Sequence, residues 1–142
     1  MLAAASRLES VSALVTINAP AQPAHVLGQL GDVEAEVTRA GEASVSIGGS
    51  TWRFTPQLVE NLRSARAAPQ ALNAALLVLH APGDTTAGIE QAEQIFAAAP
   101  QPRSLVALPG ADHLLSREAD AQYVARLILA WSSAYLGEDA TT

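Results

Sequence analysis

The segment Ala74–Asp84, AALLVLHAPGD, decides the fold. Its strand-forming part, Ala75–His80, is continuous and apolar and ends at a Pro-Gly turn, a pattern typical of a strand buried on both faces. The segment Ser104–Leu108 (SLVAL) has the same character and also ends at a Pro-Gly pair. A helix is predicted between the two strands, at Ile89–Ala98. Apolar strands that alternate with helices predict a parallel sheet.

The same alternation extends outward along the chain. Ser12–Ile17 (SALVTI) predicts a third strand, ended by Asn18-Ala19-Pro20. A helix is predicted at Met1–Leu8 and a long amphipathic helix at Arg117–Leu136. The apolar positions of the long helix are expected to pack in the core: Tyr123, Val124, Leu127, Ile128, Trp131 and Tyr135. We therefore predict a three-layer α/β/α fold with a partial parallel sheet.

The middle of the chain carries different signals. Two alternating segments flank Gly48-Gly49 within Val45–Phe54, which predicts a β-hairpin, and a helix is expected at Thr55–Ala65 with Thr55 as its cap. Pro23–Leu30 is expected to be helical, whereas the acidic stretch 31–41 is expected to be a solvated connection. We predict one partial domain over residues 1–142, with 31–66 as a cap-like excursion and 137–142 as a frayed tail.

Composition excludes several classes of function. The chain has 142 residues, a net charge of −6 and 4% aromatic residues, a composition that does not favour nucleic-acid binding. It has no Cys, and its three His residues lack metal-ligand spacing, so neither a metal nor a cofactor is expected. A basic region followed by an apolar export signal is missing, and no apolar run is long enough to span a membrane. We expect a cytoplasmic protein.

Two polar residues follow neighbouring strands. Asp84 lies four residues after His80, and His113 lies five residues after Leu108. Because functional groups gather at the carboxyl ends of parallel strands, this carboxylate and this imidazole are expected to meet. Such a pair forms two-thirds of a Ser-His-Asp catalytic set.

Each of these residues also has a structural interpretation. Asp84 fits turn chemistry, and His113 fits a hydrogen-bonded loop histidine. Asp112 is expected to brace its loop or to cap the following helix. His80 is expected to be a satisfied core histidine, and His25 a surface residue.

The segments LLVLHAPGD and LPGADHLL resemble the acid loop and the histidine loop of the α/β-hydrolase superfamily. The resemblance extends over almost the whole chain. It is strongest to the serine aminopeptidase- or esterase-like hydrolases that some bacteria carry fused to OsmC-type domains, in which similar GADHLL and hairpin segments occur. It implies that Asp84 is the triad acid and His113 the general base. The implied reaction is hydrolysis of a small-molecule ester, amide or thioester.

The nucleophile of that family is missing from the sequence. Its Ser lies in a Gly-x-Ser-x-Gly turn before the acid and the histidine, and no Ser here has Gly at both −2 and +2. We therefore expect the chain to be the C-terminal part of a longer hydrolase and inactive by itself. The alternative is a non-catalytic binding module, or a homo-oligomer that assembles through the exposed edge strand Ser12–Ile17.

Overall fold

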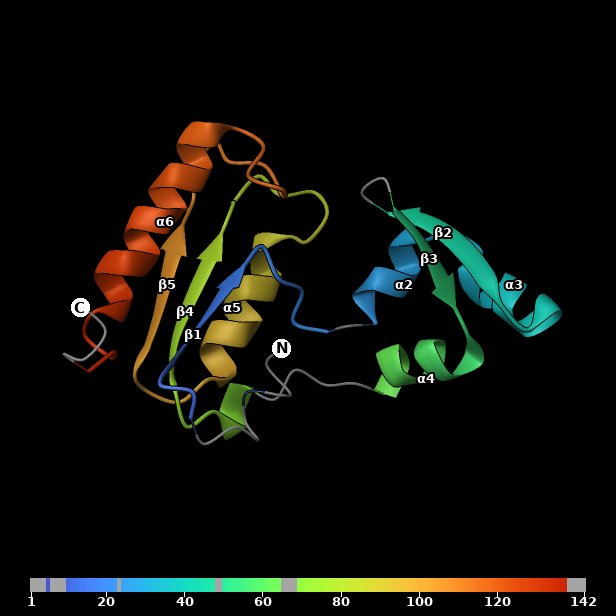
Figure 1. The fold of residues 1–142 in the computed structure, drawn as a ribbon, viewed down its shortest axis with the longest axis horizontal. Coiled ribbons are helices and arrows are strands. Elements are labelled where there is room, and N and C mark those ends of the chain that lie inside the picture. The colour runs from blue at the N-terminus through green and yellow to red at the C-terminus, as the bar shows by residue number, and fades with distance from the viewer. Residues whose placement is uncertain (1–4, 6–9, 23, 48–49, 65–68, 138–142) are drawn as a thin grey trace. The chain divides into compact units, whose positions relative to one another are not determined.

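The computed structural model describes residues 5, 10–22, 24–47, 50–64 and 69–137. The helix predicted at Met1–Leu8 falls almost wholly outside these residues. The chain divides into two compact units (Figure 1): residues 22–66 form one unit, and residues 1–21 with 67–142 form the other. We call them the hairpin unit and the sheet unit.

In the described part of the sheet unit, three parallel strands lie in the order β1-β4-β5. They are β1 (Ala13–Ile17), β4 (Ala75–His80) and β5 (Arg103–Ala107). The register pairs Ile17 with Leu79, and His80 with Ala107, so the three strands end at nearly the same level of the sheet. Their carboxyl ends therefore open onto one edge.

Helices cover both faces of this sheet (Figure 1): α5 (Ile89–Ala98) lies on one face and α6 (Glu118–Ser132) on the other. Alternate residues of β4 supply the two cores. Leu76 and Val78 pack with Ala92 and Ile95 of α5, together with Leu14 and Leu105 from the neighbouring strands. Leu77 and Leu79 pack with Val124 of α6, and with Val15, Val106, Leu127, Ile128 and Trp131. The three-layer α/β/α architecture with a partial parallel sheet is confirmed.

The outer strands and α6 are more exposed than the sequence predicts. Every residue of β4 is buried, but β5 is half-buried along most of its length, because it is an edge strand of the described sheet. The helix α6 ends at Ser132 rather than Leu136, and Tyr123 is 42% exposed. Placing Tyr123 in the core was therefore wrong, because its position on α6 lies at the margin of the packed stripe.

The described residues of the hairpin unit form three helices and a two-stranded antiparallel ribbon. In chain order these are α2 (His25–Gln29), α3 (Val33–Ala40), β2 (Ala43–Ile47), β3 (Ser50–Phe54) and α4 (Pro56–Ser64). A short 3₁₀ helix, η1 (Pro69–Ala71), follows in the sheet unit. The predicted hairpin is present, with Val45 opposite Trp52, whereas the Gly48-Gly49 turn lies outside the described residues.

The acidic stretch 31–41 is a helix and not a solvated connection. Val33 and Val37, one helical turn apart, are both buried in the core of the hairpin unit, while the acidic residues occupy the other faces. Gly41 ends α3 in the left-handed conformation (φ 83°) that favours glycine. The sequence did not predict this helix because only one pair of buried apolar positions indicates it, and the acidic residues around that pair favoured a solvated connection.

The core of the hairpin unit is small. Phe54 is buried with Leu27 and Val59, whereas Trp52 is 58% exposed. The cap predicted for α4 is present, since the hydroxyl of Thr55 accepts a hydrogen bond from the backbone N–H of Leu58 at 3.3 Å.

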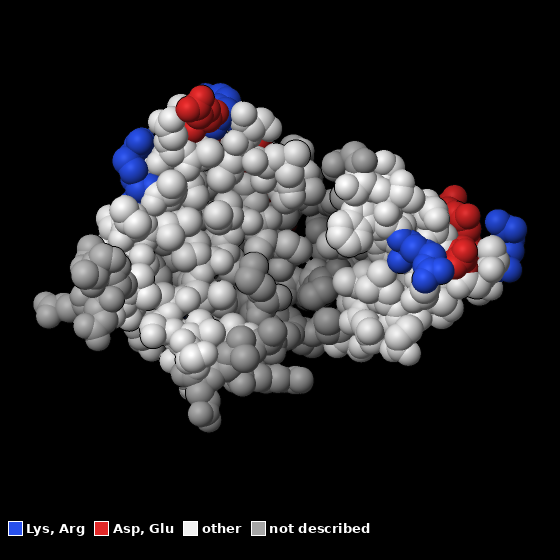
Figure 2. All heavy atoms as spheres, in the orientation of Figure 1, with Lys and Arg blue, Asp and Glu red and all other residues white. Residues whose placement is uncertain are grey.

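Among the described residues, no helix is both long enough and apolar enough to cross a bilayer. On the face drawn in Figure 2 the visible arginines do not form a continuous basic patch, and several stand beside acidic groups.

Because β4 is the centre of both cores, Leu79→Ala is expected to reduce the free energy of unfolding by about 2–5 kcal/mol. Leu79 is fully buried, while Leu129 on α6 is 76% exposed. The matched variant Leu129→Ala is expected to stay within about 0.5 kcal/mol of the parent. Urea unfolding followed by circular dichroism measures both, and equal losses in the two variants would contradict the central role of β4.

Candidate active site

Two loops meet at the carboxyl edge of the sheet. The first, which we call the acid loop, comprises residues 81–87 after β4, and the second, the histidine loop, comprises residues 108–116 after β5. Asp84 lies in the first loop and His113 in the second. Carboxylate Oδ2 of Asp84 is 2.6 Å from Nδ1 of His113. The structure therefore brings together the two residues that the sequence singled out.

Asp84 is buried and accepts three hydrogen bonds. Its side chain is inaccessible to solvent, and its Oδ1 accepts hydrogen bonds from the backbone N–H groups of Thr86 (2.7 Å) and Ala87 (3.0 Å). Burial raises the pKa of this carboxyl, but the hydrogen bonds from His113, Ala87 and Thr86 outweigh burial and hold the pKa below its ordinary value of 3.8. Asp84 is therefore ionised at neutral pH.

The ionised carboxylate determines the tautomer of His113. A carboxylate only accepts hydrogen bonds, so Nδ1 of His113 carries the proton in this pair. In the neutral imidazole, Nε2 then has a free lone pair. The side chain is 32% exposed, and no described residue is hydrogen-bonded to Nε2. This is the geometry of an oriented general base.

His80 is hydrogen-bonded to the backbone of the acid loop. It is completely buried at the end of β4, and its Nε2 lies 2.7 Å from the backbone carbonyl of Ala87, which only accepts hydrogen bonds. Nε2 therefore carries the proton and donates it. The same nitrogen is 3.9 Å from Oδ2 of Asp84. His80 is a core histidine, as its position in the sequence predicts, but it is not fully satisfied, because its buried Nδ1 has no hydrogen-bond partner among the described residues. Its Nε2 anchors the end of the loop that carries Asp84.

Asp112 braces the histidine loop. Its Oδ1 accepts hydrogen bonds from the backbone N–H groups of Leu114 (3.0 Å) and Ser116 (2.9 Å), and the bonds from Ser116 and Leu114 hold the pKa of Asp112 below its usual range. The structural interpretation of Asp112 is thus confirmed. His25 is exposed in α2 of the hairpin unit, as expected.

Sequence reasoning missed one residue at this edge. Asn18 follows β1 directly and is 3% exposed. Its side-chain amide nitrogen donates to the backbone carbonyls of Asp112 (3.2 Å) and His113 (2.9 Å), and its Oδ1 accepts from the N–H of Ala81 (2.8 Å). In the sequence, Asn18-Ala19-Pro20 was interpreted only as the end of a strand. The signal that could have identified Asn18 is its position: it is an amide residue directly after a strand, at the edge of the sheet where functional groups gather.

A pocket of about 350 Å³ opens beside the Asp84–His113 pair. It lies wholly within the sheet unit. Its lining residues come from the two loops: Gly83, Asp84, Thr85, Thr86, Asp112, His113, Leu114 and Ser116. The side chain of Leu114 is 79% exposed at this edge, so an apolar group stands next to the imidazole. The pocket has the size and the mixed lining expected of a small-molecule site.

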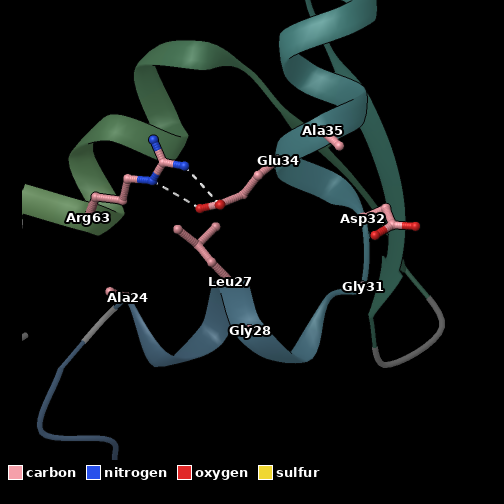
Figure 3. Close-up of a pocket in the computed structure, with 8 residues that line it drawn as sticks. All are labelled: Ala24, Leu27, Gly28, Gly31, Asp32, Glu34, Ala35 and Arg63. Atoms are coloured by element: carbon pink, nitrogen blue, oxygen red, sulfur yellow. Dashed lines mark hydrogen bonds and ion pairs between the residues drawn. The ribbon is translucent and has the colours of Figure 1, made fainter.

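A second pocket, of about 470 Å³, lies in the hairpin unit (Figure 3). Glu34 and Arg63 face each other across it and form a two-pronged ion pair, Nε to Oε1 at 3.0 Å and Nη2 to Oε2 at 2.8 Å. The hydrogen bond from Arg63 lowers the pKa of the Glu34 carboxyl. The charges of Glu34 and Arg63 neutralise each other, so this ion pair offers no unmatched charge for catalysis.

The described residues contain no group of three or more His, Asp and Glu side chains placed to hold a metal ion. The acid–histidine pair can accept and release a proton at Nε2 of His113. A parallel sheet between helices, with a hydrogen-bonded acid and histidine after adjacent strands, defines an α/β protein of the hydrolase type.

Solved structures similar to this chain are α/β-hydrolases. The esterase domain of a Rhodothermus marinus protein is 38% identical, with a TM-score of 0.76, over 96% of this chain and 57% of that domain. The α/β-hydrolase GrgF from Penicillium is 14% identical, with a TM-score of 0.68, over 94% of this chain and 59% of that one. Mouse α/β-hydrolase domain-containing protein 10 is 18% identical, with a TM-score of 0.67, over 94% and 57%.

The chain has the α/β-hydrolase fold, and its sequence is similar to part of the Rhodothermus marinus esterase domain. It spans a little more than half the length of these solved structures. No protein-family model matches it, and neither does any curated protein.

The lowered pKa of Asp84 predicts a pH dependence of stability. Because the folded-state pKa is depressed, the stabilisation is complete above the unfolded-state pKa and is lost as pH falls from about 5 through the folded-state pKa. Asp84→Asn is expected to be less stable than the parent at pH 7 and to lose stability less steeply in acid. Urea midpoints measured at a series of pH values test this.

Asp112 also titrates with a lowered pKa, so the acid slope of Asp84→Asn is reduced rather than abolished. The matched control is Asp32→Asn, at an exposed residue of the hairpin unit, and its slope is expected to equal that of the parent. An unchanged acid slope in Asp84→Asn would contradict the assignment.

Proposed function

We propose that this chain supplies the acid and the general base of a serine hydrolase that acts on a small-molecule ester, amide or thioester. Asp84 is the triad acid and His113 the base. The observation that carries the proposal is the 2.6 Å contact between a buried, ionised carboxylate and Nδ1 of a partly exposed imidazole. The buried carboxylate orients the ring and stabilises the imidazolium that forms during the reaction.

In this mechanism His113 acts through Nε2. It takes the proton of a serine hydroxyl while that oxygen attacks the carbonyl carbon of the substrate, and it then gives the proton to the leaving group. The products of this half-reaction are an acyl-enzyme and an alcohol, amine or thiol. His113 next activates a water molecule, which releases the acid and restores the serine.

The serine comes from a segment other than these 142 residues. No Ser in the sequence has Gly at both −2 and +2, the arrangement that the strained nucleophile turn of this family requires. The chain also spans only 57% of the Rhodothermus marinus esterase domain. A longer reading frame that encodes a Gly-x-Ser-x-Gly turn upstream of Met1 is therefore part of the proposal.

The ester is the favoured substrate class. The solved structure that is 38% identical to this chain is named as an esterase domain. The pocket beside His113 is small, about 350 Å³, and carries Leu114 and two threonines, which suits a small, mostly apolar acyl or alcohol group.

A fluorophosphonate probe tests the proposal, because it labels only an activated serine. The 142-residue chain is expected to remain unlabelled, and the product of the upstream-extended frame is expected to be labelled. In the extended protein, His113→Gln and Asp84→Asn are expected to lower ester hydrolysis about 10³- to 10⁴-fold.

The matched controls are His25→Gln and Asp32→Asn, which change the same residue types at exposed positions in the hairpin unit. Both are expected to keep the activity of the parent. If the extended protein is neither labelled nor sensitive to His113→Gln, the hydrolase proposal fails.

One observation favours a second candidate, self-association through β1. Within the described part of the chain, β1 is hydrogen-bonded to a strand on one side only, and Ile17 at its end is 39% exposed. Unpaired apolar edges recruit further strands. We propose this as the alternative, in which two copies pair edge to edge.

Ile17→Lys tests the alternative, because a charge on an edge strand opposes pairing with another strand. The 142-residue chain is expected to sediment as a dimer at micromolar concentration and the variant as a monomer. Leu129→Lys, at an exposed apolar position on α6, is the control and is expected to remain dimeric. A parent chain that sediments only as a monomer excludes this mode of assembly.

A further inference from the structure

We infer that Asn18 is the positioning residue that sets the distance between the acid loop and the histidine loop. The role of these loops in catalysis rests on the function proposed above, but the positioning itself is a property of this chain. Among the described residues outside the two loops, Asn18 is the only one whose side chain is hydrogen-bonded to both of them.

The side-chain amide of Asn18 is fully used. Its nitrogen donates to the backbone carbonyls of Asp112 and His113, and its oxygen accepts from the backbone N–H of Ala81. These partners lie 94, 95 and 63 positions away in the sequence. A side chain with two donors and an acceptor on one rigid plane holds such partners in one geometry, and only Asn and Gln provide that set.

The bond from Ala81 continues to the acid. The carbonyl of Ala81 accepts a hydrogen bond from the backbone N–H of Asp84 at 3.0 Å, so the turn that carries the carboxylate begins at the residue that Asn18 holds. On the other side, Asn18 holds the backbone of His113 itself. One amide therefore connects the main chain of the base to the first residue of the turn that carries its acid.

The backbone of Asn18 explains why this residue type is required. Asn18 has φ of 46°, in the left-handed region that Gly, Asn and Asp enter more readily than other residues. Its N–H still donates to the carbonyl of Leu79 at 3.0 Å, so the chain turns away from the sheet directly after the last hydrogen bond between β1 and β4. Gly and Asp can adopt this backbone conformation, but neither carries the amide donors.

Two substitutions separate positioning from mere support of the fold. Asn18→Asp keeps the size, the backbone conformation and the acceptor for Ala81, but replaces both donors by an oxygen that faces two carbonyl oxygens. Asn18→Gly keeps the backbone conformation and removes all three side-chain bonds. The first variant loosens the histidine loop alone, and the second loosens both loops.

Nuclear magnetic resonance of the ¹⁵N-labelled chain provides the readout. In the parent, the Nδ1 proton of His113 is expected to give a downfield resonance, because it is held against the carboxylate of Asp84. Asn18→Asp is expected to abolish or broaden this resonance while the amide signals of Thr86 and Ala87, which bond to Asp84, stay in place. Asn18→Gly is expected to shift those amide signals as well.

The control is Asn73→Asp, the same chemical change at an exposed residue of the sheet unit. It is expected to leave the His113 resonance unchanged. The amide signals of β4 and β5 report whether each variant is folded. If Asn18→Asp is folded and its His113 resonance equals that of the parent, Asn18 does not position the pair and the inference is overturned.

If both variants unfold, the parent chain decides. Slow exchange of the Asn18 side-chain amide protons, with Overhauser contacts to His113 and Leu114, supports the inference, and fast exchange without these contacts overturns it. In the upstream-extended enzyme, Asn18→Asp is expected to lower kcat on the order of 10²-fold with little change in KM. An extended protein without hydrolase activity would refute the proposed function alone, since the resonance test needs no turnover.

Discussion

The parallel pairing of β4 with β1 and β5 is the constraint on which the site depends. Because the register ends all three strands at one level, the residues that leave the sheet lie side by side. Asn18, the acid loop and the histidine loop therefore meet, although they are far apart in the sequence. The apolar residues of β4 pack against helices on both faces of the sheet and so fix the positions of these strand ends.

Burial and hydrogen bonding act in opposite directions on the pKa of Asp84. Burial disfavours the charge on Asp84, yet three hydrogen bonds, one of them from His113, more than compensate and keep it ionised. Each of those bonds depends on the shape of the acid loop, which His80 holds at Ala87 and Asn18 holds at Ala81. The charge that orients the imidazole thus depends on two side chains, His80 and Asn18, that hold the backbone of the acid loop by hydrogen bonds.

Much of the fold could be predicted from sequence because its signals are local. The bounds of β4 and α5 agree with the prediction, since a continuous apolar segment between turn residues and an amphipathic segment between Gly and Pro are both read within about ten residues. The prediction failed where the signal was weak or long-range. The helix α3 has only two buried positions, which is a weak signal. The exposure of Tyr123 depends on how far the packed stripe of α6 extends, and the exposure of β5 depends on which strand lies at the edge of the described sheet.

The sequence by itself determined the alternation of strands and helices in the sheet unit, the two loops that carry Asp84 and His113, and the expectation that these residues meet. Strand ends can be assigned to one edge of a parallel sheet without coordinates, because all parallel strands point the same way. Only the tertiary structure decided the 2.6 Å contact, the burial of the carboxylate and the part played by Asn18. Those features arise from hydrogen bonds and packing between segments far apart in the sequence, and local patterns carry no record of such partners.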